Sequence, residues 1–324
     1  MEFLWRLLWE AAMTHEACNA VLDRINSVKP KKFFLDTDTA NEIDDQFAVA
    51  YALLSDNIDV VGFGAAPFLN DNAESVADGM EKSYAEIVRV RDLTLPGCTI
   101  PAWPGADRYL PDRHTPVDSD AARAIIRACH ETDDFVFVAS IGCFTNAASA
   151  LLLDPSIGKN MVSILIGAND VDLYRSANDF NLRQDRAAAQ VILECGTNVI
   201  LLPAAGGTEV LHLTAMECAY ALENKNIPVG DYLTGLMRRD HDVPAGMVKS
   251  TTHIIWDIAS VAILRDIWGF WEPEIRDALS VDDEGMFRAS PSGGKMLYNK
   301  RYRRDGIFTD LFCLICEKAA RRAG

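Results

Sequence analysis

The feature that most constrains this 324-residue sequence is a repeated alternation between short apolar runs and longer helical patterns. Stretches with the 3.6-residue period of a helix lie at 46–55, 73–91, 145–154, 185–196 and 208–225. The apolar runs that precede them lie at 31–38, 58–67, 134–142, 161–168 and 198–205. Strands that are apolar on both faces and alternate with helices form parallel sheets covered on both sides. The sequence therefore predicts an α/β fold with a doubly wound, mostly parallel (mixed) open sheet.

The two ends of the chain depart from this alternation. Residues 1–30 have apolar positions at helical spacing, and the charges of Glu2, Arg6 and Glu10 interrupt any continuous apolar core of the kind found in a signal peptide. Beyond residue 226 we expect loops at 238–250 and 289–306 around a helical stretch at 256–270. We therefore expect an amphipathic helical extension over 1–30 and a single catalytic domain over 31–324.

Composition limits the partners of this chain. The formal net charge of −16 and the pI of about 4.8 disfavour nucleic acid and anionic membrane surfaces as partners. The sequence lacks an uninterrupted apolar stretch of the roughly 20 residues that span a bilayer. The eight cysteines are scattered and do not show the spacing of a disulfide scaffold, which favours a reducing compartment. We expect a cytoplasmic protein that binds a small molecule.

The first apolar run leads into a dense cluster of acids, which comprises Asp36, Asp38, Glu42, Asp44 and Asp45. A purely structural explanation makes Asn41 a helix cap and places Asp44 and Asp45 in a first helical turn, where the helix dipole favours them. That explanation leaves Asp36 and Asp38 unaccounted for. Crowded carboxylates at a strand end repel one another unless a cation neutralises them, and oxygen ligands favour Ca²⁺ or Mg²⁺. The sequence therefore predicts a site for a hard divalent cation.

Two enzyme classes compete for this cluster. The stretch Asp36-Thr37-Asp38-Thr39 resembles the D-x-D-x-T nucleophile motif of haloacid dehalogenase-like phosphatases, which use Mg²⁺. The same strand, followed by Asp44-Asp45 and an alanine-rich helix, resembles the signature of the nucleoside hydrolase family. The phosphatase class also requires a later lysine and a distal acidic pair, for which no persuasive candidate follows the other strands. The nucleoside hydrolase family has three further landmarks.

All three landmarks have a counterpart here. "SIGCFTNAASALLLDP" resembles the family's stretch whose threonine donates its carbonyl oxygen to Ca²⁺, here Thr145. "GANDVDLYRSANDFNLRQDRAAAQVI" resembles the segment whose acid and amide hold the ribose, here Asp179 and Asn181, with Asn169 a further candidate. "IIWDIASVAILRDIWGF" resembles the helix that carries the distal calcium ligand, here Asp257. The chain is thus similar to inosine-uridine preferring nucleoside hydrolases over about 31–315.

The resemblance implies a calcium-dependent hydrolase that cleaves the N-glycosidic bond of a ribonucleoside or related N-riboside. Its implied calcium ligands are Asp38, Asp45, Thr145 and Asp257. Asp38 would also activate a metal-bound water, and Asp36 would orient the loop from behind these ligands. The implied substrate-binding residues are Asp44, Asn70, Asn169, Asp179, Asn181 and Trp256. The family resemblance also implies a homodimer or homotetramer.

The sequence departs from the family pattern at three positions. The loop between Asp38 and Asp44 has five residues, where the best-known members have three. Trp256 stands where many members carry the histidine that protonates the departing base, which leaves His253, Tyr84, Tyr174 and Tyr298 as unranked candidates for that role. Asp179 replaces the usual glutamate. These departures predict a variant branch with a different leaving group, and they keep open a non-catalytic, calcium-dependent nucleoside or sugar binder.

Overall fold

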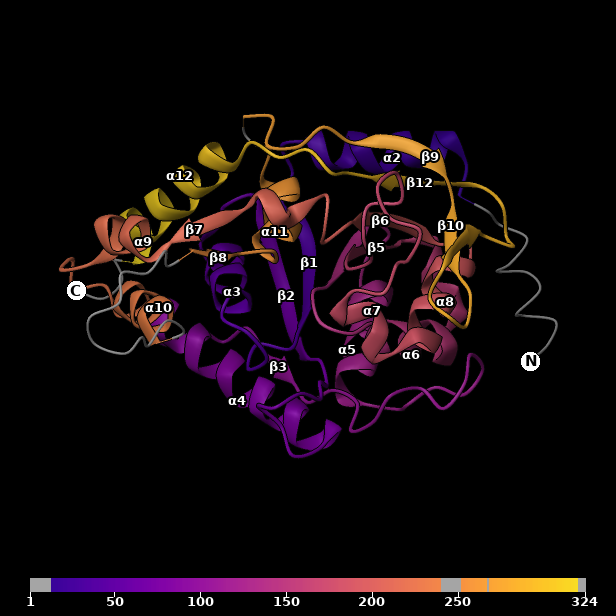
Figure 1. The fold of residues 1–324 in the computed structure, drawn as a ribbon, viewed down its shortest axis with the longest axis horizontal. Coiled ribbons are helices and arrows are strands. Elements are labelled where there is room, and N and C mark those ends of the chain that lie inside the picture. Colours follow the sequence, from indigo (N-terminus) through magenta and orange to yellow (C-terminus); the bar gives the residue numbers. More distant parts are fainter. Residues whose placement is uncertain (1–12, 240–251, 267, 320–324) are drawn as a thin grey trace.

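The computed structural model describes residues 13–239, 252–266 and 268–319, and its centre is an eight-stranded mixed sheet (Figure 1). The first 12 residues of the expected helical extension, and most of the loop expected at 238–250, lie outside the described residues. The strands of the sheet are β1 (Lys31–Thr37), β2 (Ile58–Ala65), β3 (Ala102–Trp103), β4 (Val136–Ser140), β5 (Met161–Ile166), β6 (Asn198–Leu202), β9 (Glu274–Asp277) and β12 (Lys295–Tyr298). Their order is β3-β2-β1-β4-β5-β6-β12-β9, and every neighbouring pair is parallel except β12 and β9.

Helices cover both faces of this sheet. The α-helices of the described residues are α2 (His15–Asn26), α3 (Asp45–Leu54), α4 (Val76–Thr94), α5 (Asp120–His130), α6 (Thr145–Leu153), α7 (Phe180–Gln184), α8 (Arg186–Glu194), α9 (Ala215–Leu222), α10 (Pro228–Arg239), α11 (Ile258–Arg265) and α12 (Arg304–Leu314). Figure 1 shows α3 and α10 on one side of the central strands, and α6 and α8 on the other. Successive residues of β1 join different cores: Phe33 and Leu35 pack with α3 and α11, and Phe34 packs with α5 and α6. The doubly wound, mostly parallel arrangement is confirmed.

The strand order reverses direction beside β1. The chain runs outward from β1 through β2 to β3, then crosses to β4 on the other side of β1 and continues to β6. At such a reversal the loops after the two flanking strands diverge and leave a crevice beyond their carboxyl ends. The acidic stretch that follows β1 lies at this point.

Two expectations about the second half of the chain are wrong. Residues 208–225 are not one helix: a short 3₁₀ turn (Thr208–Val210) and strand β7 (His212–Thr214), which pairs with β8 (Thr252–Ile254), precede α9. The expected loop at 289–306 contains β12, which pairs with β6 inside the sheet, and the start of α12. Both strands have four residues or fewer, so they are too short to show a pattern in sequence. A separate hairpin of β10 (Leu279–Val281) and β11 (Phe287–Ala289) lies between β9 and β12.

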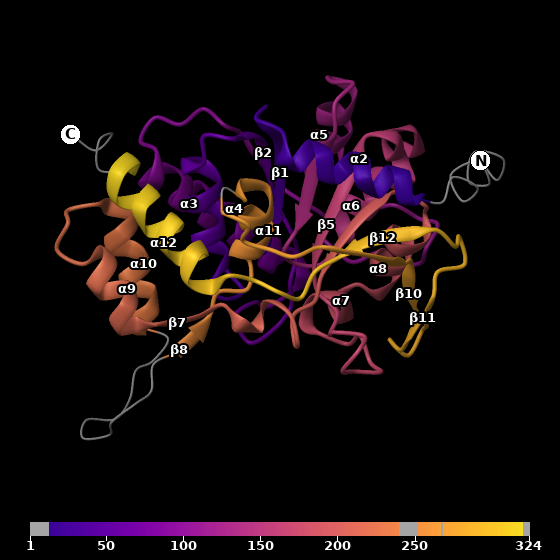
Figure 2. The ribbon, with the colours of Figure 1, turned by 90° about the horizontal axis from the view of Figure 1, so that it is seen from above.

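The described part of the N-terminal extension is a helix packed on the domain, and Figure 2 shows α2 beside the central strands. Thr14 caps α2 by accepting a hydrogen bond from the Ala17 N–H at 3.1 Å. Val21 and Ile25 are buried in the same core as β1. Among the described residues, none of the helices is long and apolar enough to cross a membrane.

Candidate functional site

A cavity of about 240 Å³ lies at the carboxyl ends of the central strands. Its walls come from the loops after β1, β4, β5 and β6 and from the turn before α11. Eight of the residues predicted from sequence line it together: Asp38, Asp44, Asp45, Asn169, Asp179, Asn181, Trp256 and Asp257. The sheet therefore gathers side chains that are up to 219 positions apart in the chain, the separation of Asp38 and Asp257.

Three carboxylates meet at the floor of this cavity. One oxygen each of Asp44, Asp45 and Asp257 lies within 4.8 Å of the other two, and all three residues are buried. Asp44 and Asp257 are the N-cap residues of α3 and α11, two helices that pack together. Neither residue makes a side-chain cap hydrogen bond, and the expected cap, Asn41, does not cap α3. The two helix N-termini thus present their acids to one point.

Asp38 completes the acidic wall. Its side chain is 2% exposed, and its Oδ2 atom has no hydrogen-bond partner among the described residues. Gly142, two residues after β4, allows this position, because a Cβ atom there would lie 2.7 Å from the Asp38 carboxyl carbon. A buried carboxylate oxygen without a partner is costly in an empty protein site and calls for a cation or a proton donor.

Electrostatics point to the same requirement. Burial raises the pKa of Asp38, Asp44, Asp45 and Asp257 well above the ordinary aspartate value, and repulsion among these acids raises each pKa further. The donor atoms are carboxylate oxygens, which suit a hard divalent cation such as Ca²⁺ or Mg²⁺. The residues present therefore fit a hard divalent cation.

Asp36 lies behind the cavity and does not line it. It is fully buried, and its Oδ1 atom accepts a 2.8 Å hydrogen bond from the side-chain amide of Asn146 in α6. Burial raises the pKa of Asp36 to about 7. Gly64 on β2 leaves room for this carboxyl, because a Cβ atom there would lie 2.7 Å from it. Asp36 thus ties β1 to α6 beneath the acidic wall.

Asp179 and Asn181 line the same cavity as the acids. Asp179 caps α7, and its carboxylate accepts hydrogen bonds from the N–H groups of Ala168, Asn181 and Leu182 at 2.8, 3.2 and 3.1 Å. Burial nonetheless raises the pKa of Asp179 to about 6. The Asn181 amide donates to the carbonyl oxygens of Ile141 and Ile166, 2.7 and 3.0 Å away. Both side chains are therefore fixed before any ligand binds.

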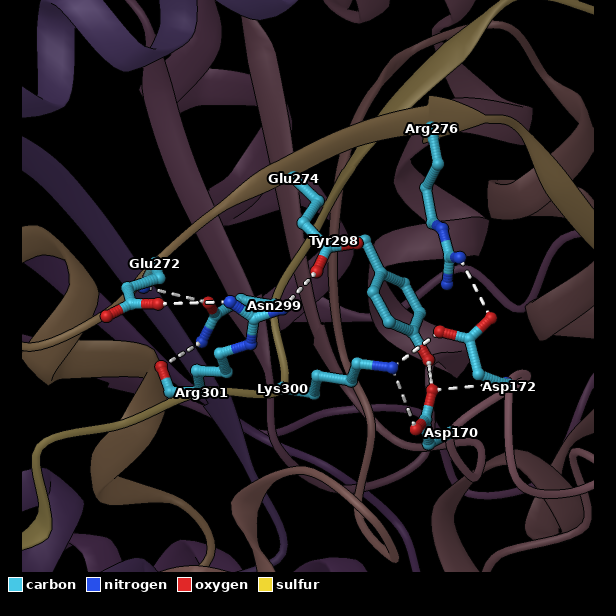
Figure 3. Close-up of polar contacts among 9 residues, drawn as sticks. All are labelled: Asp170, Asp172, Glu272, Glu274, Arg276, Tyr298, Asn299, Lys300 and Arg301. Atoms are coloured by element: carbon cyan, nitrogen blue, oxygen red, sulfur yellow. Dashed lines mark hydrogen bonds and ion pairs between the residues drawn. The ribbon is translucent and has the colours of Figure 1, made fainter.

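Asn169 belongs to a loop that a polar network holds in place (Figure 3). The next residue, Asp170, is 1% exposed and accepts hydrogen bonds from the Tyr298 hydroxyl at 2.7 Å and the Lys300 ammonium at 3.2 Å. The Asp170 N–H donates to the carbonyl oxygen of Ala205, 2.8 Å away, and Ala205 lines the cavity. The network thus joins the segments after β5, β6 and β12 into one wall.

Two further predicted residues, besides Asp36, do not line the cavity. Asn70 donates its side-chain amide to Asn41 at 2.5 Å. Thr145 is buried and donates its hydroxyl to Asp185 at 2.6 Å, so only its backbone carbonyl is left for the ligand role that the family resemblance implies. Sequence reasoning also missed lining residues, namely Ile141, Ile166 and Phe180. These apolar residues have no pattern that separates them from the core.

The chain is similar in sequence to known nucleoside hydrolases. The profile of the family "Inosine-uridine preferring nucleoside hydrolase" matches residues 33–300. "Probable uridine nucleosidase 2" of Arabidopsis thaliana is 27% identical over 208 residues, which span 57% of this chain and 62% of that protein.

Two solved structures share the fold. A purine-preferring ribonucleoside hydrolase from Gardnerella vaginalis has a TM-score of 0.71 and 18% identity over 90% of this chain and all of its own. The plant nucleoside hydrolase PpNRh1 has a TM-score of 0.68 and 17% identity over 89% of this chain and 99% of its own. With the family profile matching most of its length, this chain belongs to the inosine-uridine preferring nucleoside hydrolase family, whose members are N-ribosyl hydrolases.

Proposed function

We propose that this chain hydrolyses the N-glycosidic bond of a ribonucleoside or a related N-riboside, with calcium as its cofactor. The observation that carries the proposal is the presence, in one cavity, of the carboxylates of Asp38, Asp45 and Asp257 and the fixed pair Asp179 and Asn181. The first group suits a cation and the second suits a polyol. Family membership supplies the reaction class.

The calcium ion would be held by Asp38, Asp45 and Asp257, with the Thr145 carbonyl oxygen as a further ligand. When bound, such an ion neutralises the clustered carboxylates, binds hydroxyl groups and makes a water molecule more acidic. Asp44, whose carboxylate lies within 4.8 Å of those of Asp45 and Asp257, is assigned to a ribose hydroxyl next to the ion.

Asp38 is the general base of the proposed reaction. Its Oδ2 atom, buried and without a partner in the described part of the chain, takes a proton from the attacking water. The water oxygen bonds to the anomeric carbon, and the electron pair of the C–N bond leaves with the base. The sugar passes through an oxocarbenium-like state, as in other glycoside hydrolyses.

The remaining residues hold the substrate. Asp179, Asn181 and Asn169 line the same cavity as the acids and would bind the ribose hydroxyls. Because backbone hydrogen bonds already fix the Asp179 and Asn181 side chains, these side chains lose little conformational entropy when the sugar binds. The aromatic faces of Phe180 and Trp256 in the same cavity would contact the base.

The test is base release from a panel of nucleosides, measured by chromatography before and after treatment with a calcium chelator. Asp38→Asn is expected to lower kcat by about 10²–10⁴-fold, the range for loss of a general base. Asp107→Asn is the matched control, because Asp107 is an exposed aspartate that pairs with Arg108 away from the cavity. Full turnover after exhaustive chelation would contradict the proposed calcium dependence.

The same preparations separate the two alternatives. A phosphatase that used Asp36 would turn over p-nitrophenyl phosphate and lose this activity in Asp36→Asn, although Asp36 is fully buried and does not line the cavity. A non-catalytic binder, which the presence of Trp256 favours, would bind nucleosides in a calorimeter but release no base over hours. Base release that depends on Asp38 excludes both.

A further inference from the structure

The cavity is lined by many acidic side chains. Six carboxylates line it: Asp38, Glu42, Asp44, Asp45, Asp179 and Asp257. The other lining residues are amides, aromatic residues and aliphatic residues, so none of the described residues that line the cavity is a lysine, arginine or histidine. One divalent cation compensates two of the six formal charges, so the described lining stays acidic when all six acids are ionised.

Burial orders these acids by depth. The three acids assigned to calcium, together with Asp44, are 2–4% exposed, whereas Glu42 is exposed and Trp256 is half-buried. With the ribose at the buried acids, we assign the base to the part of the same cavity that Glu42 and Trp256 line. The base then meets a carboxylate and an aromatic face, the pair of groups that recognises organic cations.

None of the described residues that line the cavity is a histidine or a tyrosine. His253, Tyr84, Tyr174 and Tyr298, the candidates from sequence, are absent from the cavity wall, and the Tyr298 hydroxyl is bonded to Asp170. A neutral base leaves as an anion unless it is protonated. A cationic base needs no proton, because the electron pair of the broken C–N bond neutralises its charge.

We propose that the preferred substrate is an N-riboside with a cationic base and no phosphate, namely a pyridinium or N7-alkylpurinium riboside, with Glu42 and Trp256 recognising the charged ring. This inference rests on the proposed function and narrows its substrate class. Water and the cationic riboside give ribose, the neutral base and one proton, and Asp38 takes this proton from the water. A phosphorylated riboside is disfavoured because its charge has the same sign as that of the cavity.

The first test compares kcat/KM for two matched substrates, 7-methylinosine and inosine. The third substrate, p-nitrophenyl riboside, is neutral, and its leaving group also departs without being protonated. We expect kcat/KM for 7-methylinosine and for nicotinamide riboside to be at least 100-fold higher than for inosine and at least tenfold higher than for p-nitrophenyl riboside. Equal kcat/KM values for 7-methylinosine and p-nitrophenyl riboside would mean that the rate depends only on how easily the leaving group departs. This result would overturn the claim that the cavity recognises the positive charge of the base. Faster turnover of inosine would overturn the inference and leave the proposed function intact, whereas failure to cleave any riboside would overturn the proposed function.

Glu42 provides the second test. In Glu42→Gln the ratio of kcat/KM for 7-methylinosine to that for inosine is expected to fall about tenfold, and in the matched control Glu81→Gln, an exposed glutamate of α4, the ratio is expected to stay unchanged. An unchanged ratio in Glu42→Gln would contradict its assigned role.

A binding measurement keeps the inference independent of turnover. The carbocyclic analogue of nicotinamide riboside, whose C–N bond cannot hydrolyse in this way, is expected to bind the calcium-loaded protein at least tenfold more tightly than carbocyclic inosine. Its affinity is expected to weaken with added salt because the attraction is ionic. Tighter binding of the neutral analogue would overturn the inference.

Discussion

The hydroxyl of Tyr298, the last residue of β12, donates a 2.7 Å hydrogen bond to Asp170, the residue next to Asn169 in the cavity wall. Tyr298 is fully buried, and its hydroxyl also accepts a 3.1 Å bond from the Val171 N–H. A strand that sequence inspection assigns to a loop therefore holds one wall of the candidate site.

Removing this hydroxyl is expected to loosen the wall. Tyr298→Phe deprives buried Asp170 of one donor and the Val171 N–H of its acceptor, which should lower the free energy of unfolding by about 1–3 kcal/mol. Because Asn169 only positions substrate, KM should rise more than kcat falls. Urea denaturation and steady-state kinetics measure both effects. Tyr220→Phe, at a side chain 93% exposed on α9, is the control, and equal behaviour of the two variants would contradict the assigned role.

Gly142 provides a steric test of the position of Asp38. In Gly142→Ala the new Cβ atom would lie 2.7 Å from the Asp38 carboxyl carbon, so the carboxylate has to move. A displacement of about 1 Å in a catalytic group costs on the order of 10²-fold in rate, and we expect a loss of this size in kcat. The control is Gly235→Ala in α10, where a Cβ atom lies more than 4 Å from every described atom outside its own helical backbone and chain neighbours, and where alanine should stabilise the helix by about 1 kcal/mol. Wild-type kcat in Gly142→Ala would show that Asp38 does not act from this position.

Substrate binding should depend on pH through Asp179. Burial raises its pKa from the ordinary value of 3.8 to about 6, so the folded protein carries a protonated Asp179 below pH 6 and a carboxylate above it. Only the carboxylate accepts hydrogen bonds from ribose hydroxyls with both oxygens. KM should therefore rise as pH falls from 7 to 5. In Asp179→Asn the KM should be high throughout and should lose this dependence, and a wild-type profile in the variant would refute the assignment.

Much of the fold was predictable because its central strands are buried on both faces. The runs at 31–38, 134–142, 161–168 and 198–205 contain β1, β4, β5 and β6, since continuous apolar residues leave few other structures open to them. β12 was not predictable: four residues after two glycines become a sheet strand only because β6 and β9 offer free edges. Tertiary pairing decides strands of this length.

Some residues of the candidate site were predictable from the local sequence and others were not. The acids of residues 36–45 stand out by local density, whereas Asp257 became a candidate only through family resemblance, because an aspartate before an apolar helix is a common cap. Asn41 does not cap α3, because the helix begins at Asp45 with Asp44 as its N-cap; the Asn41 side chain accepts a hydrogen bond from Asn70. Local propensity does not describe a side chain that a distant loop engages.

The central claim is that Asp38, Asp45 and Asp257 together hold one calcium ion that N-riboside hydrolysis requires. The most direct measurement is a calcium titration of chelator-stripped protein that follows bound calcium and the rate of base release in the same samples. The account predicts that both saturate together at one calcium per chain, and that Asp257→Asn weakens the two curves in parallel by at least tenfold. Base release that is already maximal before calcium is added, or calcium binding that Asp257→Asn leaves unchanged, would contradict it.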